Sequence, residues 1–542
     1  MSPPDINPAE VCNINVGVMG HVDSGKTSLV KSLSAILSTA SLDKNPQSRA
    51  RGITLDLGFS AFLSDIPSQL KDSKYKYIQY TLVDCPGHAS LIRTILGGAQ
   101  IIDMLLIVID CLKGIQTQTA ECMVIGEITT DKAIFVLNKI DLLPEKDRSS
   151  RIQSIETGLR KTLSKTRFKN APIIAVAAQV GGGSIEDANT TSIGMDQLVS
   201  TICGMVSIPN KIDNQPLYFV YDHCFSLAGK GCVMTGTIQS GRIAVNDEIE
   251  FPSLHIMRKV KSIQMFHKNI DCAYKGDRAG VCVQSFDYKT ERGEACSVGS
   301  LSSMQTILIR LRKVRFFKGD IASGSTFHIS IGHHTIPATI TLFADESKEE
   351  VVFADRFGVN VFSEEVDSFD FSKSYQYVPT YLKPAPNEPR PTLWALLQLE
   401  TPIFAPRGCL LIGSHLNVAS SDTSCRIAFY GKVIQVLSPE KEALTALRVY
   451  KPKMRSAVVD RVVSELEVIG TNLLEKGGSV QPFVGLKVVT KDGVEGVIDA
   501  PFGKTGKFKV VFRSDHRLSK NDELFVHFRR YLYDKDKKIQ QD

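Results

Sequence analysis

A glycine-rich loop between an apolar run and a predicted helix constrains the fold of this chain most strongly. Residues 20–27 follow the pattern Gly-x-x-x-x-Gly-Lys-Thr, and the apolar run "INVGVMG" leads into them. In this context the pattern predicts a loop whose backbone N–H groups surround phosphates at a helix N-terminus. Lys26 should reach the β- and γ-phosphates, and the Thr27 hydroxyl should ligate Mg²⁺. The predicted phosphate-binding residues are Asp23, Ser24, Gly25, Lys26, Thr27 and Ser28.

Five apolar runs predict the fold around this loop. They are "INVGVMG", "YIQYTLVD", "MLLIVID", "AIFVLNK" and "PIIAVAA", and amphipathic stretches separate them. Near-continuous apolar strands of this kind are typical of a parallel sheet covered by helices on both faces. Ligands bind outside the carboxyl ends of such strands, so the site residues should lie in the loops that follow them. We therefore predict an α/β P-loop domain over residues 13–208, after a flexible N-terminus of residues 1–12.

The segment Asn138-Lys139-Ile140-Asp141 distinguishes between the nucleotide bases. It ends a predicted buried strand, where the carboxylate of Asp141 can accept hydrogen bonds from N1–H and the N2 amine of guanine. Adenine lacks this pair of donors, so the carboxylate would be left unpaired beside it. Asn138 should tie the base region to the phosphate loop, and the stem of Lys139 should pack on the ring. The sequence therefore predicts a GTP-binding domain.

Three further residues should respond to the γ-phosphate. Asp84, in "DCPG", would hold Mg²⁺ through water, and the Gly87 N–H would meet the γ-phosphate. Thr54, in "RARGITLDLGF", would ligate Mg²⁺ only while the γ-phosphate is present. As an isolated string the segment around Thr54 could equally be a helix cap, and the neighbouring motifs favour the switch.

His88 directly follows "DCPG" and is the candidate catalytic residue. Its predicted position beside the γ-phosphate would let it orient the attacking water, with Val22 and Ile53 as the apolar residues that restrain it. Hydrolysis at such a site is slow until a partner completes the site. We therefore predict a GTPase whose function depends on the timing of hydrolysis.

Beyond residue 208 the pattern changes to short strands with frequent turns. Paired strands such as those in "FHISIGHHTIPATITLF" predict two small β-barrels, residues 214–300 and 304–436, the second with an exposed proline-rich loop, "YLKPAPNEPRPT". Residues 437–542 are predicted as a mixed α+β domain, with a helix over about residues 455–474 and a hairpin at Asp492-Gly493.

Charge and cysteine content bound the partners and the compartment. From Lys441 to the end of the chain there are 20 Lys and Arg against 14 Asp and Glu, so this part carries the whole formal charge of +6. An anionic partner, nucleic acid first, is expected there, although a merely solvated basic surface would look the same. The twelve cysteines include no C-x-x-C pair, and neither a secretory signal nor an apolar membrane span stands out. We expect a cytoplasmic protein and leave a nuclear fraction open.

The motifs "GHVDSGKT", "RGIT", "DCPGH" and "NKID", followed by two small barrels, resemble the translational GTPases. Within that group, "RGITLDLGFSAF", "YDHCFSLAGKGCVMTGTIQSG" and "GDRAGVCVQSFD" are similar to the selenocysteine-specific elongation factors of eukaryotes. The fifth guanine motif departs from the usual Ser-Ala, but Ala177-Ala178-Gln179 keeps the backbone amide that would meet the guanine O6.

This resemblance implies a pocket for the aminoacyl group at Asp222, His223 and Arg278. A selenol is more acidic than the cysteine thiol, whose reference pKa is about 8.5, so selenocysteine is largely anionic at neutral pH. Arg278 and a protonated His223 would then favour it over serine. Without the resemblance, an ordinary Asp–Arg ion pair explains the same residues.

The implied partners are selenocysteinyl-tRNA, the ribosome at recoded UGA codons, and the protein bound to the selenocysteine insertion element of the mRNA. The implied cofactors are GTP and Mg²⁺, and we expect a monomer without a membrane partner. Two other functions remain open at this point: an initiator-tRNA-carrying subunit of an initiation factor, and a regulatory GTPase that binds no tRNA. The initiation subunit is disfavoured by the lack of a cysteine cluster suited to its zinc knuckle, and the regulatory GTPase by the basic C-terminal region.

Overall fold

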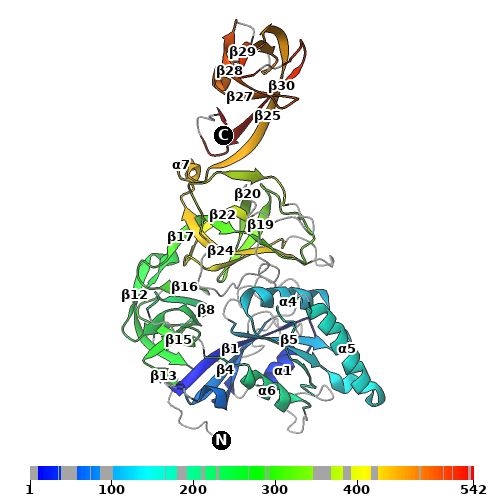
Figure 1. Cartoon of the computed structure of the whole chain (residues 1–542). Coiled ribbons are helices and arrows are strands. Elements are labelled where there is room, and N and C mark those ends of the chain that lie inside the picture. Colours follow the sequence, from blue (N-terminus) through cyan, green and yellow to red (C-terminus); the bar gives the residue numbers. More distant parts are fainter. Residues whose placement is uncertain are drawn as a thin grey trace.

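The protein consists of an α/β domain and three β-barrels, with the third barrel at the far end from the α/β domain (Figure 1). No helix in the part of the chain described below is both long and apolar enough to cross a membrane. The computed structural model describes residues 10–33, 36–37, 58–71, 73, 75–85, 102–164, 166–179, 192–208, 214–227, 231–265, 268–286, 290, 292–345, 368–381, 392–416, 425–474, 478–503, 506–514, 517–534 and 539–541.

Seven strands form the sheet of the α/β domain, in the order β2-β3-β4-β1-β5-β6-β7. The strands from β4 to β7 in this order are parallel, and β2 (Ile36–Leu37) and β3 (Gly58–Asp65) extend the sheet in antiparallel pairing. The parallel strands coincide with the five predicted apolar runs: β1 (Val11–Gly20), β4 (Tyr77–Asp84), β5 (Met104–Asp110), β6 (Ala133–Asn138) and β7 (Ile173–Ala175). The predicted parallel sheet is confirmed.

Helices cover both faces of this sheet, as predicted. Alternating residues of β5 enter opposite cores, because successive side chains of a strand point to opposite faces. Leu106 and Val108 join the core under α1 (Lys26–Leu33) and α6 (Met195–Gly204). Leu105 and Ile107 join the core under α4 (Thr117–Thr129) and α5 (Arg148–Leu163). Because both faces of these strands are buried, polar and apolar residues do not alternate along them.

The first barrel closes through the order β11-β16-β8-β9-β15-β12 and a further pairing of β12 with β11. Short strands and turns such as Ser240-Gly241 build it, as predicted. Its strands are β8 (Tyr218–Leu227), β9 (Gly231–Ser240), β10 (Arg242–Ala244), β11 (Glu248–Phe251), β12 (Ile256–Met265), β13 (Lys268–Ile270), β14 (Cys272–Tyr274), β15 (Arg278–Val283) and β16 (Gly293–Cys296).

The second barrel closes through the order β19-β23-β24-β17-β22-β20 and a pairing of β20 with β19. The proline-rich loop predicted within it lies outside the described residues, apart from its first and last positions. The strands are β17 (Ser302–Arg310), β18 (Arg312–Lys313), β19 (Thr326–Ile331), β20 (His334–Asp345), β21 (Tyr375–Val378), β22 (Leu393–Ala405), β23 (Leu410–Ser414) and β24 (Ile427–Leu437).

The helix predicted for residues 455–474 is wrong, because this segment forms two antiparallel strands, β25 and β26. Ala457 and Val459, two positions apart, are both buried in the core of this domain, as expected for one face of a strand. β-branched residues such as Val462 favour an extended backbone. Helix in the described part of residues 437–542 is limited to α7 (Lys441–Thr445) and the single turn Gln481–Phe483. The domain is therefore a third barrel, with β25 (Val449–Ser464), β26 (Glu467–Thr471), β27 (Lys487–Thr490), β28 (Glu495–Phe502), β29 (Lys507–Phe512), β30 (Glu523–Tyr531) and β31 (Ile539–Gln540).

The hairpin predicted for this domain is present. The predicted turn at Asp492-Gly493 joins β27 to β28. Along β29 the basic residues Lys507 and Lys509 face outward, and the aromatic residues Phe508 and Phe512 are buried. Phe502, the last residue of β28, is exposed.

Candidate functional site

The glycine-rich loop occupies residues 21–25, between the end of β1 and the start of α1. Gly25 has a φ of +87°, in the left-handed region that favours glycine. A Cβ at Gly25 would lie 2.3 Å from Nδ2 of Asn138. Both constraints exclude a side chain here, so the loop backbone is held directly against the end of β6.

Asn138 joins three segments that the sequence places far apart. Its Nδ2 donates to the backbone oxygen of Ser24 at 3.0 Å, and its Oδ1 accepts from the Ala178 N–H at 3.2 Å. The side chain is 2% exposed, so both hydrogen bonds are shielded from water. The contact expected between the base-recognition segment and the phosphate loop is therefore present, and the loop after β7 shares it.

Lys139 lies across the same edge of the sheet. It has a left-handed backbone, with a φ of 67°, and its Nζ donates to Oδ2 of Asp110 at 2.8 Å and to the backbone oxygen of Asp23. Burial alone would raise the pKa of Asp110, but hydrogen bonds from Lys139 and from the Leu112 N–H outweigh it and lower that pKa. The pair fixes the stem of Lys139 beside the loop, where a base would stack.

The predicted phosphate and magnesium ligands come together at the start of α1. Lys26 is buried, and its Nζ donates to the His21 backbone oxygen at 2.7 Å. Burial lowers the pKa of Lys26, and the nearby Asp84 carboxylate opposes this shift. The Thr27 hydroxyl donates to Oδ2 of Asp84 at 2.7 Å. A buried ammonium, a hydroxyl and a carboxylate at a helix N-terminus fit a nucleotide phosphate and its cation.

The remaining predicted nucleotide residues divide into two groups. Ser28, in α1, and Asp141, just after β6, are partly buried. Asp23 is exposed and has a left-handed φ of 59°, and Gln179 is partly exposed. The Val22 N–H donates to Oε1 of Gln118, on α4, at 3.3 Å. Four predicted residues lie outside the described residues: Thr54 and Gly87, predicted to contact Mg²⁺ or the γ-phosphate, and His88 with Ile53, predicted to orient the attacking water and to restrain His88.

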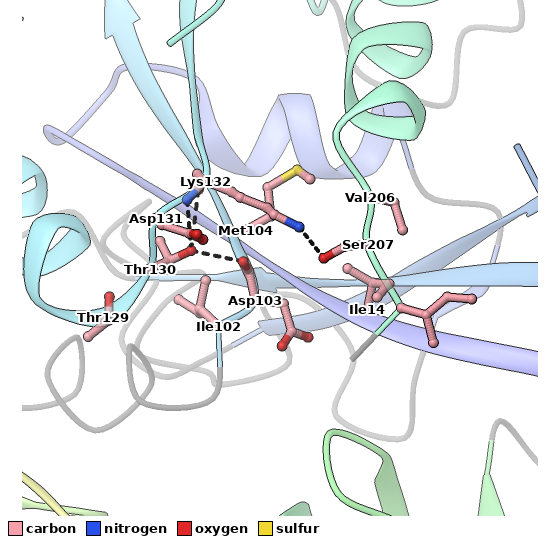
Figure 2. A pocket seen from close by; sticks show the side chains of 11 residues that line it. Ile14, Ile102, Asp103, Met104, Thr129, Thr130, Asp131, Lys132, Val206 and Ser207 are labelled. Atoms are coloured by element: carbon pink, nitrogen blue, oxygen red, sulfur yellow. Dashed lines mark hydrogen bonds between the residues drawn. The ribbon is translucent and has the colours of Figure 1, made fainter. Parts of the chain in front are cut away.

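A cavity of about 390 Å³ lies at the other end of the sheet (Figure 2). Residues that precede β5 and β6, such as Asp103 and Thr130, line it together with Ser207. The phosphate loop follows the carboxyl end of β1, which runs parallel to β5. This cavity is therefore separate from the nucleotide site.

The three residues of the predicted aminoacyl pocket are neighbours in the first barrel. Arg278 starts β15 and donates from Nη1 and Nη2 to the two carboxylate oxygens of Asp222, at 2.7 and 2.8 Å. The pairing of β8 with β9 shifts register between Tyr221 and His223, so Asp222 lies in a bulge. The Arg278 side chain is 6% exposed. His223 is 36% exposed and places Nε2 3.9 Å from the Asp222 carboxylate.

This pocket is tied to the α/β domain by two asparagines that we did not predict. Nδ2 of Asn13 and Nδ2 of Asn15, both on β1, donate to the backbone oxygen of Gly276 at 2.9 and 2.8 Å. Gly276 lies in the turn that precedes Arg278. Polar residues two positions apart in an otherwise apolar buried strand were the available signal in the sequence.

Comparison with known proteins agrees with this architecture. Residues 12–208 match the family "Elongation factor Tu GTP binding domain", and residues 231–297 match "Elongation factor Tu domain 2". Residues 308–431 match "Selenocysteine-specific elongation factor, eukaryotes, 3rd domain", and residues 445–524 match "eEFSec C-terminal RIFT domain".

Relatives with similar sequences cover nearly the whole chain. The mouse selenocysteine-specific elongation factor is 44% identical over 523 residues, which are 92% of this chain and 88% of the mouse protein. The chain belongs to the selenocysteine-specific elongation factors. The factor from Methanocaldococcus jannaschii is 30% identical over 506 residues, 92% of this chain and 94% of that protein.

The solved structure of translation elongation factor SelB from Methanococcus maripaludis, in complex with the GTP analogue GppNHp, has a similar fold. Its TM-score is 0.68 at 25% identity, and the match covers 96% of this chain and 99% of that one. GTP binding by this member of the family follows from its α/β domain. The relatives do not favour the alternative of an initiation-factor subunit.

Proposed function

We propose that this elongation factor binds GTP and selenocysteinyl-tRNA and delivers the tRNA to the ribosome at recoded UGA codons. The observation that carries this proposal is the bidentate Asp222–Arg278 pair in the first barrel, in which Arg278 is buried and Asp222 is partly buried. The same chain contains a phosphate loop and a guanine segment that Asn138 holds together. The α/β domain supplies a nucleotide-dependent state, and the barrel supplies a site for an anionic side chain.

In the pocket, Arg278 is a preorganised cation rather than a flexible one. Its bidentate hydrogen bonds to Asp222 fix the plane of the guanidinium. The selenolate of selenocysteine carries the negative charge that such a site favours, and the neutral serine hydroxyl does not. His223 adds a second positive charge when it is protonated, and Asp222 orients both groups or meets the α-amino group.

At the nucleotide site, Lys26 would contact the β- and γ-phosphates, and Thr27, Asp84 and Thr54 would hold Mg²⁺. Mg²⁺, when bound, neutralises charge on these phosphates. The Asp84 carboxylate accepts a hydrogen bond from the Thr27 hydroxyl at 2.7 Å, so these two oxygen ligands lie next to each other. The Asp141 carboxylate would read the guanine edge, and the Ala178 region would meet its O6.

GTP hydrolysis belongs to this family of α/β domains. We propose that the ribosome stimulates it, with His88 orienting the attacking water between Val22 and Ile53. The γ-phosphate contacts of Thr54 and Gly87 would be lost after hydrolysis, and the tRNA would be released.

The third barrel is the proposed contact for the protein bound to the selenocysteine insertion element. Part of its basic charge is already neutralised, since Lys507 pairs with Asp460 at 2.7 Å and Lys509 with Glu467 at 2.9 Å. Arg513 and Arg530 are exposed and are the better candidates for RNA or an acidic protein surface. A monomer in the cytoplasm, where ribosomes translate, agrees with this role, and cell fractionation would test for a nuclear pool.

The deciding experiment is equilibrium binding of the GTP-loaded protein to one tRNA charged with selenocysteine or with serine. We expect a clear preference for selenocysteine that Arg278→Ala removes. Arg242→Ala, an exposed arginine of the same barrel, is the matched control and should keep the preference. Unchanged GTP binding in each variant shows that the chain is folded.

The other outcomes are equally informative. Equal binding of both charged tRNAs would contradict selection by charge in the pocket. If neither tRNA binds while GTP does, delivery of tRNA is the wrong function.

A further inference from the structure

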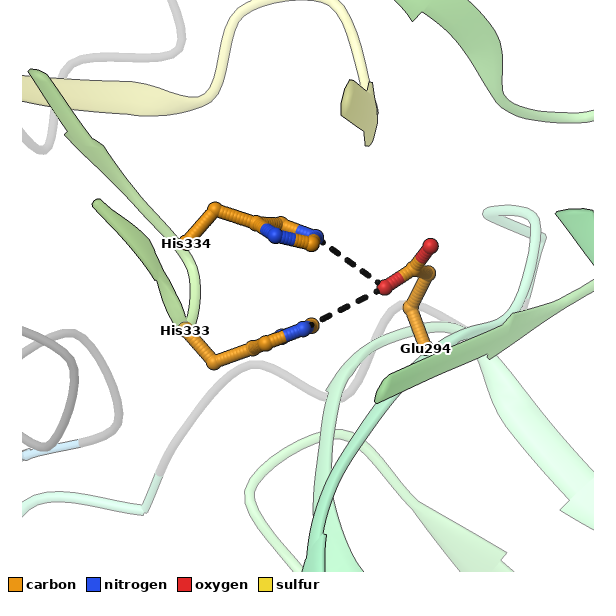
Figure 3. Close-up of side chains that lie close together, drawn as sticks. All are labelled: Glu294, His333 and His334. Atoms are coloured by element: carbon orange, nitrogen blue, oxygen red, sulfur yellow. Dashed lines mark hydrogen bonds and ion pairs between the residues drawn. The ribbon is translucent and has the colours of Figure 1, made fainter. Parts of the chain in front are cut away.

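A cluster of two histidines and one glutamate joins the first barrel to the second (Figure 3). Glu294 lies on β16 of the first barrel. In the second barrel, His333 lies in the turn between β19 and β20, and His334 is the first residue of β20. One ligand atom from each residue falls within 4.8 Å of the other two. Figure 3 shows both imidazole rings directed at the same carboxylate.

The distances in this cluster fit a tetrahedral metal site. Nε2 of His334 lies 3.2 Å from Oε2 of Glu294, and Nε2 of His333 lies 3.4 Å from the same oxygen. In a tetrahedral zinc site with bonds of about 2.0–2.1 Å, neighbouring ligand atoms lie about 3.3 Å apart. The two measured distances agree with the edges of such a tetrahedron.

The chemistry of the three side chains also suits a cation. An imidazole nitrogen offers a lone pair to a metal ion, and a carboxylate oxygen supplies negative charge.

Two further observations concern the surroundings of the three ligands. The Ser253 hydroxyl donates to Oε1 of Glu294, which orients the carboxylate and leaves Oε2 facing the histidines. Nδ1 of His333 is buried and has no hydrogen-bond partner among the described residues. The Glu294 side chain is fully buried, whereas the His334 side chain is 24% exposed and offers an entry path from solvent.

We propose that Glu294, His333 and His334 bind one divalent transition-metal ion, Zn²⁺ in the first place, at the junction of the two barrels. Two imidazoles and one carboxylate suit Zn²⁺, whereas Mg²⁺ and Ca²⁺ prefer oxygen ligands only. Three protein ligands leave a fourth position for water. Because the ligands come from both barrels, the ion would fix the orientation of one barrel relative to the other.

Calorimetric titration with Zn²⁺ tests this site. The full-length protein is first freed of metal with a chelator and then loaded with GDP and excess Mg²⁺, so that the nucleotide site is occupied. We expect one Zn²⁺ per chain. Binding should be weakened more than about 100-fold in His333→Ala and in His334→Ala, which exceeds the typical loss of about 10–100-fold for an outer-shell contact. Co²⁺ in place of Zn²⁺ should give the absorption of a tetrahedral complex in the wild type and not in either variant.

Two control variants separate this site from other ligands in the chain. His527→Ala removes an exposed histidine of the third barrel. Cys224→Ser breaks the close pair of Cys224 and Cys232, whose sulfurs lie 3.0 Å apart. Both controls should bind Zn²⁺ as the wild type does, and circular dichroism should show all variants folded.

Zn²⁺ should also raise the thermal unfolding midpoint of the wild type and leave that of His334→Ala unchanged. The partly exposed position of His334 makes loss of folding in this variant a small risk. Absence of stoichiometric Zn²⁺ in the wild type would overturn the proposal. Zn²⁺ binding as tight as that of the wild type in His333→Ala and His334→Ala would also overturn it. Loss of Zn²⁺ binding in Cys224→Ser alone would overturn it as well.

Discussion

Arg426 donates from Nε and Nη2 to the two carboxylate oxygens of Glu121, at 3.0 and 2.7 Å. The Arg426 N–H adds a third hydrogen bond to the same carboxylate, at 3.0 Å. Glu121 lies on α4, and Arg426 immediately precedes β24 of the second barrel, so the pair joins the α/β domain to that barrel. The Glu121 side chain is 6% exposed and the Arg426 side chain is 11% exposed, so this ion pair is buried.

The position of this pair along α4 connects it to the nucleotide loop. Gln118, one turn earlier on α4, accepts from the Val22 N–H, and the neighbouring Cys122 lies close to Lys26. A displacement of α4 would therefore reach both the loop and the second barrel. We expect the orientation of this barrel to depend on the nucleotide through α4.

Arg426→Ala should destabilise the contact between the two domains. It leaves the Glu121 carboxylate buried without its cation, which typically costs about 3–5 kcal/mol. The measurement is hydrogen exchange at the backbone amides of α4, which should lose protection, together with the thermal unfolding midpoint, which should fall. In the double variant Glu121→Leu with Arg426→Met most of the loss should be recovered, because no uncompensated charge remains. Equal losses in the single and double variants would contradict this explanation.

Gly25→Ala should abolish tight nucleotide binding. The added Cβ would meet Nδ2 of Asn138 at 2.3 Å, and the φ of +87° costs an alanine about 1–2 kcal/mol more. Fluorescent GDP should bind more than about tenfold more weakly, since a loss of 1.4 kcal/mol is already tenfold. Gly158→Ala is the matched control, because a Cβ there would meet nothing within 4 Å on α5. Tight binding by Gly25→Ala would show that the loop can move away from Asn138.

How far the sequence predicts this structure depends on the range of the interactions. The parallel strands were predictable because burial on both faces makes each strand apolar along its length, and Asn138 followed from its place at a strand end. The strand β25 was missed because its identity depends on pairing with β30, from Val458↔Glu523 to Tyr450↔Tyr531, and no local pattern records that partner.

The candidate sites show the same limit. Asp222 and Arg278 were named from a resemblance, but their bidentate geometry depends on a bulge in β8 that no spacing predicts. Glu121 and Arg426 are 305 positions apart, and each looks like an ordinary surface charge in its own segment. The cluster of Glu294 with His333 and His334 likewise exists only because two barrels meet there.

The Lys139–Asp110 pair predicts a pH dependence. The pKa of Asp110 is lowered in the folded state, so its contribution to stability is complete above its ordinary value of 3.8 and is lost as the pH falls through the lower folded value. The thermal unfolding midpoint of the wild type should therefore fall more steeply below about pH 4 than that of Asp110→Asn, which lacks this contribution. At pH 7 the variant should be the less stable protein. Parallel curves for the two proteins would show that Asp110 does not contribute to the acid transition.

The asparagines of β1 should affect tRNA binding without affecting nucleotide binding. In the double variant Asn13→Ala with Asn15→Ala, the partly buried Gly276 oxygen loses two donors, and each lost hydrogen bond typically costs about 0.5–1.5 kcal/mol. The turn before Arg278 should then lose protection in hydrogen exchange, and the affinity for selenocysteinyl-tRNA should fall about fivefold or more. GDP affinity should stay unchanged, because the asparagines lie at the opposite end of β1 from the phosphate loop. Asn269→Ala, which removes an exposed asparagine of the first barrel, is the control and should change neither the tRNA affinity nor the GDP affinity. If the double variant binds tRNA as tightly as the wild type, the pocket is positioned without β1.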